Sequence, residues 1–444
     1  MPALSLDDAT TMPATSGAKQ FLFAHWEGGG NTPPMLAVVR RLVGRGHTVR
    51  VLSDLCNHSE AEAAGASFAS WTRIAARPDK SIDGDPLKDW EAASPTALLA
   101  LLRDRMFVGP ALAYAQDLLQ ELRRFPADVV VANDMLLGAM AGAESAGVPC
   151  VALSSNIYSY PRPGVPPFGP GFQPAQGLAG RLRDALIRTM ALRVFGRGTP
   201  AFNATRRALG LGPVSHPFDQ VARVSKFVVL SSTAFDFPST SLPANVVYAG
   251  PELVDPAWTD TWTSPWPEED SRPLVIVGFS TTFQDQAAAL ARVIQALSTL
   301  DVRAVVTSGP AIDPTALPSA ANVLVCSSAP HNQLLPQAAA MVTHAGHGTV
   351  IRSLATGVPL LCLPMGRDQN DNAARVVARG AGMRLSPKAG ATQIREAIRQ
   401  ILESPRYRES ARTLGAKIAA EARNSRAVSV LEEVAATARR VARQ

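Results

Sequence analysis

Short apolar runs recur along the chain, and stretches with helical periodicity separate them. Ten such runs lie at 21–24, 49–52, 128–132, 150–153, 227–230, 273–279, 303–307, 322–326, 341–344 and 359–363. Their interiors are apolar rather than alternating, which is typical of strands covered on both faces. Because such strands alternate with helices, the pattern predicts an α/β fold with doubly wound parallel sheets.

Two segments of the chain repeat one plan. In 135–154 and again in 347–364, a helical stretch ends on glycine, Val-Pro follows, and an apolar run comes next. Glycine is suited to end a helix in the left-handed conformation, and proline blocks the continuation of the helix. We therefore expect two Rossmann-like lobes, each with its own sheet.

A stretch rich in proline, 246–273, marks the boundary between the lobes and predicts an ordered connector without helix or central strand. Its tryptophans, Trp258, Trp262 and Trp266, are expected to pack between the lobes rather than to stack on a ligand. The predicted organisation is a flexible tail over 1–19, a first lobe over 20–250, a linker over 251–271, a second lobe over 272–425 and a C-terminal helix over 426–444 that returns to the first lobe.

Composition narrows the classes of protein that fit. The 444 residues are 46% hydrophobic and 18% charged, which is ordinary for a chain with a sizeable core. The net charge is +6, but no block of five or six like charges favours nucleic-acid binding. No apolar run approaches the ~18 residues of a membrane helix, and the first twenty residues do not form a signal peptide. We expect a cytoplasmic protein.

The cysteines support the same expectation. They lie at Cys56, Cys150, Cys326 and Cys362, without a Cys-x-x-Cys pair. Three of the four fall inside apolar runs, where a thiol behaves as a small hydrophobic side chain. The spacing predicts buried, reduced thiols.

The strongest candidate site lies in 341–372, MVTHAGHGTVIRSLATGVPLLCLPMGRDQNDN. An apolar run ends at His344, a turn of small residues follows, and a helix begins near Gly348. Small residues let the backbone approach a ligand, and the unpaired amides of a first helical turn favour an anion. With His344 and Thr349 as further donors, the turn predicts a diphosphate site. The alternative is a plain strand-to-helix turn with a structural histidine, but two histidines, two glycines and a following Asp-Gln favour the site.

These residues carry a resemblance to a known family. The stretch 341–372, together with 28–49, 275–284 and 327–344, resembles GT-B glycosyltransferases of the UDP-glycosyltransferase and macrolide-glycosyltransferase type, most strongly over 270–425. The resemblance implies two Rossmann-like lobes that face a cleft. It also implies a donor site: His344 and the turn residues Gly346, His347, Gly348 and Thr349 hold the diphosphate, Ser280, Thr281 and Thr282 assist, His331 lies near the base, and Asp368 and Gln369 bind sugar hydroxyls.

One position departs from the family pattern. Plant-type members often carry a ribose-binding glutamate where this chain has Arg352. Antibiotic-type members also lack that glutamate. The difference favours a deoxyribose donor, a dTDP-sugar, over a UDP-sugar.

The glycine loop 28-GGGNTPP-34 first suggests a dinucleotide site. Pro33 stands where the third glycine of Gly-x-Gly-x-x-Gly belongs, so the dinucleotide fingerprint fails despite Asp54 at the end of the next apolar run. In the family that the chain resembles, this loop faces the acceptor, which makes Gly29 and Gly30 acceptor-binding candidates. A dehydrogenase is therefore disfavoured.

The general base does not follow from the family pattern alone, because family members commonly carry a catalytic histidine or aspartate where this chain has Asn31. An amide can orient a hydroxyl group but cannot deprotonate it. Asp134 follows an apolar run, where α/β ligands bind, and matches the aspartate that backs the family's histidine. We predict Asp134 as the base if burial raises its pKa from about 3.9, with capping of the next helix as the alternative. His25 and Glu27 are reserve candidates.

A second irregular region, 156–177, is rich in proline, glycine and aromatic residues. Long loops without secondary structure in a compact domain are usually binding loops or disordered segments. Its four aromatics, with Tyr158 and Phe168 foremost and Tyr160 and Phe172 beside them, indicate an apolar pocket for an acceptor.

Together these features predict an inverting, metal-independent transfer of a hexose or deoxyhexose from a dTDP- or UDP-sugar to a small hydrophobic hydroxylated acceptor, without a further cofactor. The only Asp-x-Asp motif, Asp83-Gly84-Asp85, lies in a polar stretch and is predicted as a surface turn rather than a metal site. Two alternatives stay open: a catalytically silent sugar-nucleotide-binding partner protein, and a nucleotide-sugar epimerase. Neither the sugar, the acceptor, O- versus C-transfer nor the oligomeric state follows from the sequence.

Overall fold

The first lobe is built on a seven-stranded sheet. A computed structural model describes residues 17–253, 262–279, 283–309 and 312–441, with side chains to residue 437. All described strand pairs of this sheet are parallel. The spatial order is β3 (Ser67–Ser70), β2 (Thr48–Ser53), β1 (Gln20–Ala24), β4 (Val129–Asn133), β5 (Cys150–Ser154), β6 (Lys226–Val229) and β7 (Val246–Tyr248).

The second lobe repeats this order with six strands, again all parallel among the described residues. The strands follow one another as β10 (Val323–Cys326), β9 (Arg303–Thr307), β8 (Leu274–Gly278), β11 (Ala338–Thr343), β12 (Leu360–Cys362) and β13 (Gly382–Arg384). In each lobe the chain first winds one way and then returns to the other side of its first strand. The predicted pair of doubly wound parallel sheets is confirmed.

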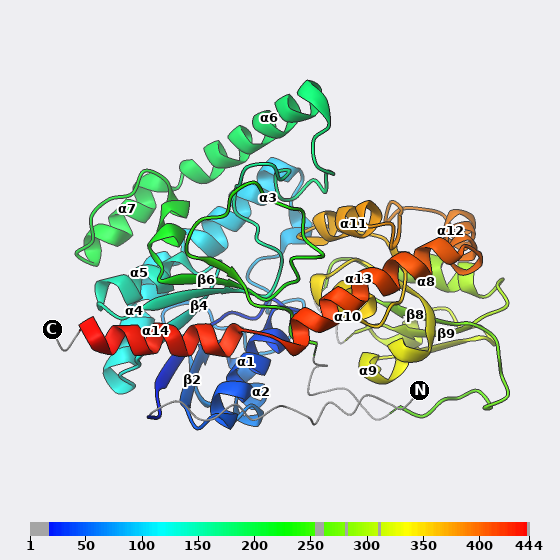
Figure 1. The fold of residues 1–444 in the computed structure, drawn as a ribbon, viewed down its shortest axis with the longest axis horizontal. Helices are drawn as coiled ribbons and strands as arrows, with labels where there is room; N and C mark the ends of the chain where they lie inside the picture. The colour runs from blue at the N-terminus through cyan, green and yellow to red at the C-terminus, as the bar shows by residue number, and fades with distance from the viewer. Residues whose placement is uncertain (1–16, 254–261, 280–282, 310–311, 442–444) are drawn as a thin grey trace.

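Helices cover both faces of each sheet (Figure 1). Those of the first lobe are α1 (Thr32–Gly44), α2 (His58–Ala63), α3 (Pro95–Leu102), α4 (Ala111–Arg124), α5 (Leu137–Ser145), α6 (Gly177–Gly196) and α7 (Thr199–Ala208). Those that follow are α8 (Ala287–Leu297), α9 (His331–Leu334), α10 (His347–Ala355), α11 (Gln369–Ala378), α12 (Ala391–Glu403), α13 (Pro405–Arg423) and α14 (Ala427–Val441). No helix among the described residues is long and apolar enough to cross a membrane.

The ten apolar runs all coincide with strands, whereas β3, β7 and β13 were not predicted. All three lie at sheet edges. An edge strand has one strand neighbour and partial cover, so it does not need an uninterrupted apolar run. Their sequences, SFAS, VVY and GMR, are accordingly short or mixed.

The repeated plan is also confirmed. Helix α5 and strand β5 are joined through Gly147, and α10 and β12 are joined through Gly357. Both glycines have positive φ, 67° and 75°. Glycine tolerates this left-handed conformation, which ends each helix and turns the chain into the next buried strand.

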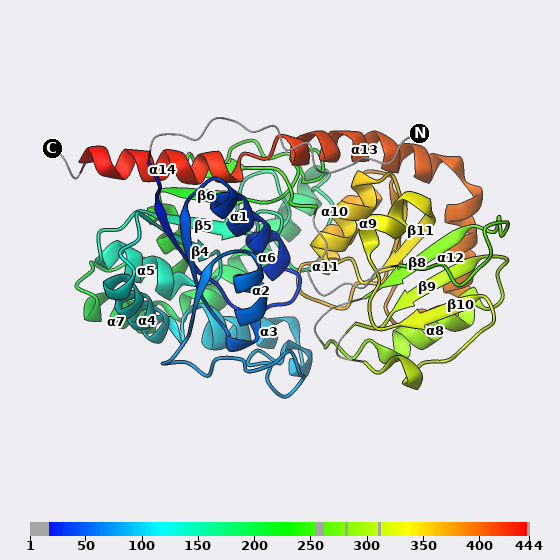
Figure 2. The ribbon, with the colours of Figure 1, turned by 90° about the horizontal axis from the view of Figure 1, so that it is seen from below.

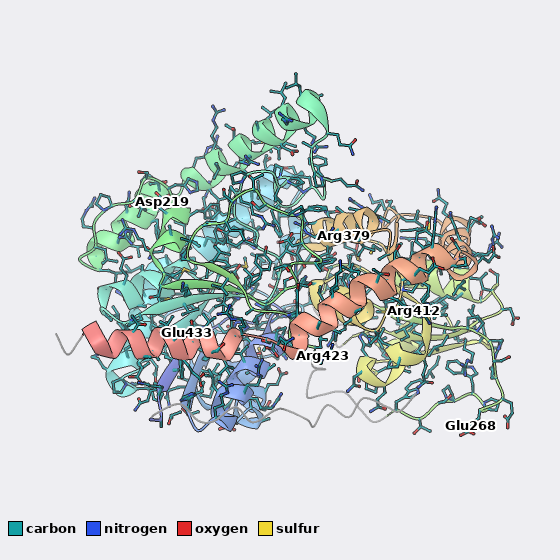
Figure 3. The ribbon with its side chains drawn as sticks, viewed as in Figure 1. Asp219, Glu268, Arg379, Arg412, Arg423 and Glu433 are labelled. Carbon is teal, nitrogen blue, oxygen red and sulfur yellow. The ribbon has the colours of Figure 1, made fainter. Side chains whose placement is uncertain are left out.

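The two C-terminal helices link the lobes (Figure 2). Helix α13 packs on α10 of the second lobe, and α14 packs on α1 and β4 of the first. Arg423, the last residue of α13, lies where the chain passes between the lobes (Figure 3). Leu431 of α14 is fully buried in the first lobe's core, and Glu432 pairs with Arg45 at 2.7 Å.

Two expectations can be compared with the structure. Trp262 and Trp266 pack against a core cluster drawn mainly from the second lobe that also contains Ile157 and Phe235 of the first, and the Arg303 guanidinium lies 6.0 Å from the Trp266 ring. Trp258 lies outside the described residues. Asp85 is buried and faces Arg77 at 3.7 Å, so the Asp83–Asp85 stretch is only partly a surface turn.

The cysteines differ in part from prediction. All four are free, as expected for reduced thiols. Cys150 and Cys362 are buried, but Cys56 and Cys326 are only partly buried. Cys56 lies in a short helical turn after β2, and Cys326 is the last residue of the edge strand β10, where cover is incomplete.

Candidate active site

A cavity of about 910 Å³ lies between the lobes. The segments that line it follow the carboxyl ends of strands in both sheets: 26–34 after β1, 133–135 after β4, 154–162 after β5, 344–349 after β11 and 367–375 after β12. In each lobe the strand order reverses beside the first strand, between β1 and β4 and between β8 and β11. Ligands of doubly wound sheets bind at such reversal points. The cavity is therefore the candidate active site.

The small-residue turn after β11 forms one wall of the cavity. His344, Gly346, His347, Gly348 and Thr349 all line it. Gly346 precedes the first residue of α10 and offers no side-chain cap, so the amides of the first turn are left for another acceptor. A Cβ atom on Gly346 would lie 2.5 Å from Nε2 of His344, so only glycine fits there. The turn brings together the predicted diphosphate-binding residues.

Burial keeps both histidines of this turn neutral near pH 7. It lowers the pKa of His344 to about 4, although the Asp368 carboxylate acts in the opposite direction. Burial likewise lowers the pKa of His347. A neutral imidazole still carries one N–H group, so each histidine can donate one hydrogen bond to a phosphate oxygen. The positive field at this wall then comes from the helix N-terminus and from Arg352, which also lines the cavity.

The predicted sugar-binding pair lies beside this turn, at the start of α11. Asp368 and Gln369 both line the cavity. The Gln369 side chain already serves the protein: its amide nitrogen donates to Oε1 of Gln284 at 2.7 Å, and its oxygen accepts from the Met365 amide at 2.8 Å. Asp368 accepts a hydrogen bond from Asn372 at 2.6 Å. The aspartate oxygens are therefore better placed for a sugar hydroxyl than the glutamine amide.

The other residues expected at the donor site separate into two groups. His331 begins α9 and does not line the cavity. A Cβ atom on Gly278 at the end of β8 would lie 3.3 Å from its ring, so the imidazole sits against that glycine. Ser280, Thr281 and Thr282 lie outside the described residues. The neighbouring Phe279 does line the cavity.

The glycine loop forms the opposite wall. Oδ1 of Asn31 accepts from the Gly28 amide at 3.2 Å, and its Nδ2 donates to the Trp26 carbonyl at 3.4 Å. A Cβ atom on Gly28 would lie 2.8 Å from the Trp26 ring, and Gly29 has a φ of 77°. The loop is thus closed on itself by Asn31, and Gly28–Gly30 line the cavity.

The reserve bases occupy different environments. His25 does not line the cavity; its imidazole lies 3.2 Å from the Thr32 hydroxyl, and burial lowers its pKa to about 3. These features argue against the predicted reserve role of His25. Glu27 does line the cavity, and burial raises its pKa, but it accepts from the Gly29 amide at 2.6 Å and from Thr32 at 3.2 Å. Glu27 therefore holds the glycine loop.

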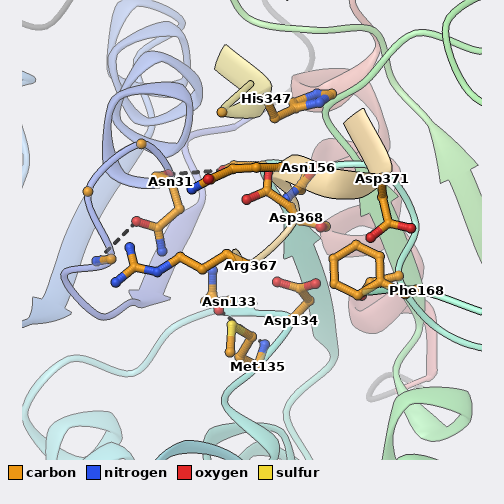
Figure 4. A pocket seen from close by; sticks show the side chains of 18 of the residues that line it. Asn31, Asn133, Asp134, Met135, Asn156, Phe168, His347, Arg367, Asp368 and Asp371 are labelled. Carbon is orange, nitrogen blue, oxygen red and sulfur yellow. Dashed lines mark hydrogen bonds between the residues drawn. The ribbon is translucent and has the colours of Figure 1, made fainter. Parts of the chain in front are cut away.

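Asp134 lies in the cavity wall directly after β4 and is only 8% exposed. Burial raises its pKa to about 7, although the Ser154 hydroxyl opposes the shift. Its backbone is held by the Leu153 carbonyl at 3.1 Å and by the Tyr160 hydroxyl at 2.6 Å. Helix α5 begins three residues later and has no side-chain cap, so Asp134 does not serve as its cap. Figure 4 shows Asp134 and Asn31 of the first lobe around the same cavity as Asp368 and His347 of the second.

Aromatic side chains enclose the end of the cavity in the first lobe. Tyr158, Tyr160 and Phe168 come from the 156–177 loop. Phe172 does not line the cavity; it packs beneath the Arg183 guanidinium at 4.1 Å. Helices α3 and α6 complete this wall with apolar residues that sequence reasoning did not identify: Leu98, Leu99, Leu102, Ala191, Leu192 and Phe195.

Asp371 is the main polar residue that the sequence analysis missed. Its Oδ2 accepts from the Gly169 amide at 2.6 Å, which ties the aromatic loop of the first lobe to α11 of the second. Burial raises the pKa of this carboxyl to about 7. A Cβ atom on Gly171 would lie 2.3 Å from the Asn370 carbonyl, so the loop approaches α11 closely. The motif 366-GRDQNDN-372 contained the signal, but nothing in it showed which acidic residue crosses the cleft.

Comparison with known proteins agrees with this architecture. Residues 291–434 match the family described as Erythromycin biosynthesis protein CIII-like, C-terminal domain. The chain is 33% identical over 426 residues to 4'-demethylrebeccamycin synthase of Lentzea aerocolonigenes, covering 93% of this chain and 98% of that protein. It is 25% identical over 414 residues to oleandomycin glycosyltransferase of Streptomyces antibioticus, covering 91% and 88%.

Solved structures share the fold across both lobes. CalG4, the calicheamicin glycosyltransferase, superposes with a TM-score of 0.70 at 21% identity over 94% of this chain and 98% of its own. The glycosyltransferase VinC in complex with dTDP gives 0.65 at 19% identity over 95% and 100%. The fold is therefore GT-B. The 33% identity to 4'-demethylrebeccamycin synthase, over 93% of this chain, shows a shared family as well as a shared fold. The chain belongs to the GT-B glycosyltransferases of natural-product biosynthesis.

Proposed function

We propose that this glycosyltransferase moves a hexose or deoxyhexose from a dTDP- or UDP-sugar to a hydroxyl group of a small hydrophobic acceptor, with inversion at the anomeric carbon. The observation that carries this proposal is Asp134, a buried carboxyl group with a pKa of about 7 in the cavity that the diphosphate-binding turn also lines. A base with a pKa near the working pH is suited to accept a proton from a hydroxyl group.

The donor is assigned to the second-lobe wall. The uncapped first turn of α10 offers amides and a positive dipole end to the diphosphate, and neutral His344 adds an N–H donor. One relative of the same fold is described in complex with dTDP. Together with Arg352 in place of the plant-type glutamate, this supports dTDP over UDP as the carrier.

The acceptor is assigned to the first-lobe end of the cavity. The walls there are apolar and aromatic, with Tyr158, Phe168 and α6 on one side and the glycine loop on the other. Such walls fit a hydrophobic ring system, and the few polar groups fix its orientation. Oleandomycin and 4'-demethylrebeccamycin appear in the names of two relatives, which supports a natural-product acceptor.

The proposed reaction proceeds in one displacement. The acceptor oxygen attacks the anomeric carbon as its proton passes to Asp134, and the bond from that carbon to the diphosphate oxygen breaks. The α10 terminus and His344 stabilise the negative charge that grows on the leaving nucleoside diphosphate. Asn31 lies in the glycine loop beside the acceptor and does not take a proton.

The proposal includes neither a metal ion nor a further cofactor. The one Asp-x-Asp motif does not line the cavity, and its Asp85 is buried against Arg77. Addition of EDTA should leave the rate of sugar transfer unchanged, whereas loss of activity that Mg²⁺ or Mn²⁺ restores would contradict this part of the proposal.

The assay is acceptor-dependent release of nucleoside diphosphate, with mass spectrometry of the product. Purified protein is incubated with dTDP- and UDP-sugars, with and without a pool of hydrophobic hydroxylated compounds. Transfer predicts release and a glycosylated product only when an acceptor is present. Release without acceptor, or binding without turnover, would contradict the proposed reaction; the second result would favour a silent partner protein.

The donor site has a matched control. In calorimetric titration with dTDP, His344→Ala should raise the Kd by about tenfold or more, since a hydrogen bond to a charged group contributes roughly 1.5–3 kcal/mol. Gly30→Ala should bind normally, because a Cβ atom at Gly30 meets no atom within 4 Å. The opposite pattern would place the diphosphate at the glycine loop.

A further inference from the structure

Helix α6 carries an apolar stripe on its outer face. Leu178, Leu182, Leu186 and Met190 are 81%, 72%, 69% and 38% exposed. Residues four apart lie on one side of a helix, so these side chains form a row over about 18 Å of helix axis. Figure 1 shows α6 along the outside of the first lobe, projecting away from its body.

The charges around this stripe are positive. Arg181, Arg193 and Arg197 are exposed on α6 or at its end. The only acidic residue in the α6 sequence, Asp184, is buried and pairs with Arg183 at 2.8 Å. The outer face of α6 therefore presents leucines flanked by cations and fits an anionic apolar surface.

We propose that the outer face of α6 docks on a lipid surface that contains anionic headgroups. Exposed leucines with arginines beside them can bind in the plane of the bilayer interface, where apolar burial and charge attraction add together. The proposal concerns binding to a surface and does not depend on the reaction assigned above.

Two observations favour lipid over a protein partner. The stripe exposes on the order of 400 Å², about half of the ~800 Å² per partner that a stable protein interface buries. A second copy of α6 would also place arginines against arginines. Both features suit a peripheral contact with an anionic bilayer, which needs no complementary protein surface.

The opposite face of the same helix gives the contact a use. Arg188, Ala191, Leu192 and Phe195 line the acceptor end of the cavity. Docking by the outer face would therefore hold that end of the cavity beside the bilayer interface, where hydrophobic compounds concentrate.

The test is flotation of the full chain with vesicles of phosphatidylcholine, with and without about one third phosphatidylglycerol. Wild-type protein should float with the anionic vesicles. Its binding to neutral vesicles, and to anionic vesicles at high salt, should be about tenfold weaker. A variant with Leu178→Ser, Leu182→Ser and Leu186→Ser should lose anionic-vesicle binding about tenfold. Arg181→Gln with Arg193→Gln should weaken it and reduce its dependence on salt.

Matched controls separate the stripe from exposed residues in general. Leu242 is 40% exposed and does not belong to α6, and Arg123 is exposed on α4, so Leu242→Ser and Arg123→Gln should bind as wild type. Circular dichroism establishes that each variant is folded, and transfer activity without vesicles should be unchanged in the leucine variant. Absence of wild-type binding to anionic vesicles, or full binding by the leucine variant, would overturn the proposal. A dimer in sedimentation that the leucine variant dissociates, without vesicle binding, would overturn it in favour of a second copy.

Discussion

Replacing Asp134 by asparagine should make the enzyme inactive and, at alkaline pH, more stable. The substitution keeps the size of the side chain and removes its charge. Because the base acts on the proton of the acceptor, kcat should fall by about 10²–10⁴, the usual contribution of general base catalysis. The wild-type rate should rise with pH through an apparent pKa near 7, and the variant should lose that inflection.

The stability effect follows from the raised pKa of Asp134. Burial shifts it from 3.8 to about 7, so the folded state binds this proton more tightly than the unfolded state does. The contribution of Asp134 to the unfolding free energy therefore falls as pH rises from about 4 to about 7, by up to ~4 kcal/mol for roughly three pKa units. The asparagine variant does not undergo this loss. The altered hydrogen bond with Ser154 costs the variant about 1 kcal/mol. The unfolding free energy of the variant should therefore exceed that of wild type by ~3 kcal/mol near pH 8.

Urea unfolding at about pH 5 and about pH 8 measures this difference, beside a pH–rate profile of sugar transfer. Asp54→Asn is the control, since Asp54 is also a buried aspartate with a raised pKa but does not line the cavity. It should leave the inflection near pH 7 unchanged. Near-normal turnover in Asp134→Asn, or a wild-type rate independent of pH between about 6 and 8, would refute the assignment of the base.

Three further predictions concern positions around the site and the fold. Asn31→His should raise kcat, because histidine can take the proton that asparagine cannot; an unchanged or lower kcat would contradict the family alignment at this position. Gly171→Ala should raise KM for the acceptor more than KM for the donor, since φ is 69° and a Cβ atom would clash with α11. Asp371→Asn should act in the same direction. Equal effects on both KM values would contradict a role in acceptor binding for the contact between the 156–177 loop and α11. Leu431→Ala should cost about 2–5 kcal/mol in urea unfolding because the side chain is fully buried, whereas exposed Leu178→Ala should stay within about 0.5 kcal/mol; similar losses in both would contradict the packing of α14 on the first lobe.

The sequence by itself determined the elements that local chemistry specifies. Strands buried on both faces must be apolar, so all ten apolar runs are strands, and Gly147 and Gly357 end their helices where the pattern placed them. The turn from His344 was identifiable because a helix start with small residues has an intrinsic affinity for anions. The edge strands β3, β7 and β13 escaped prediction because a strand with one neighbour needs no continuous apolar run.

Only the tertiary structure decided what depends on contacts between distant segments. The bond from the Gly169 amide to Asp371 and the ion pair of Arg367 with Asp89 at 2.6 Å join residues from different lobes, and no local pattern specifies such pairs. The raised pKa of Asp134 likewise depends on how completely the fold removes its carboxyl group from water. The outer leucines of α6 and its cavity-lining apolar residues lie on different faces of one helix, and only packing shows which face remains exposed.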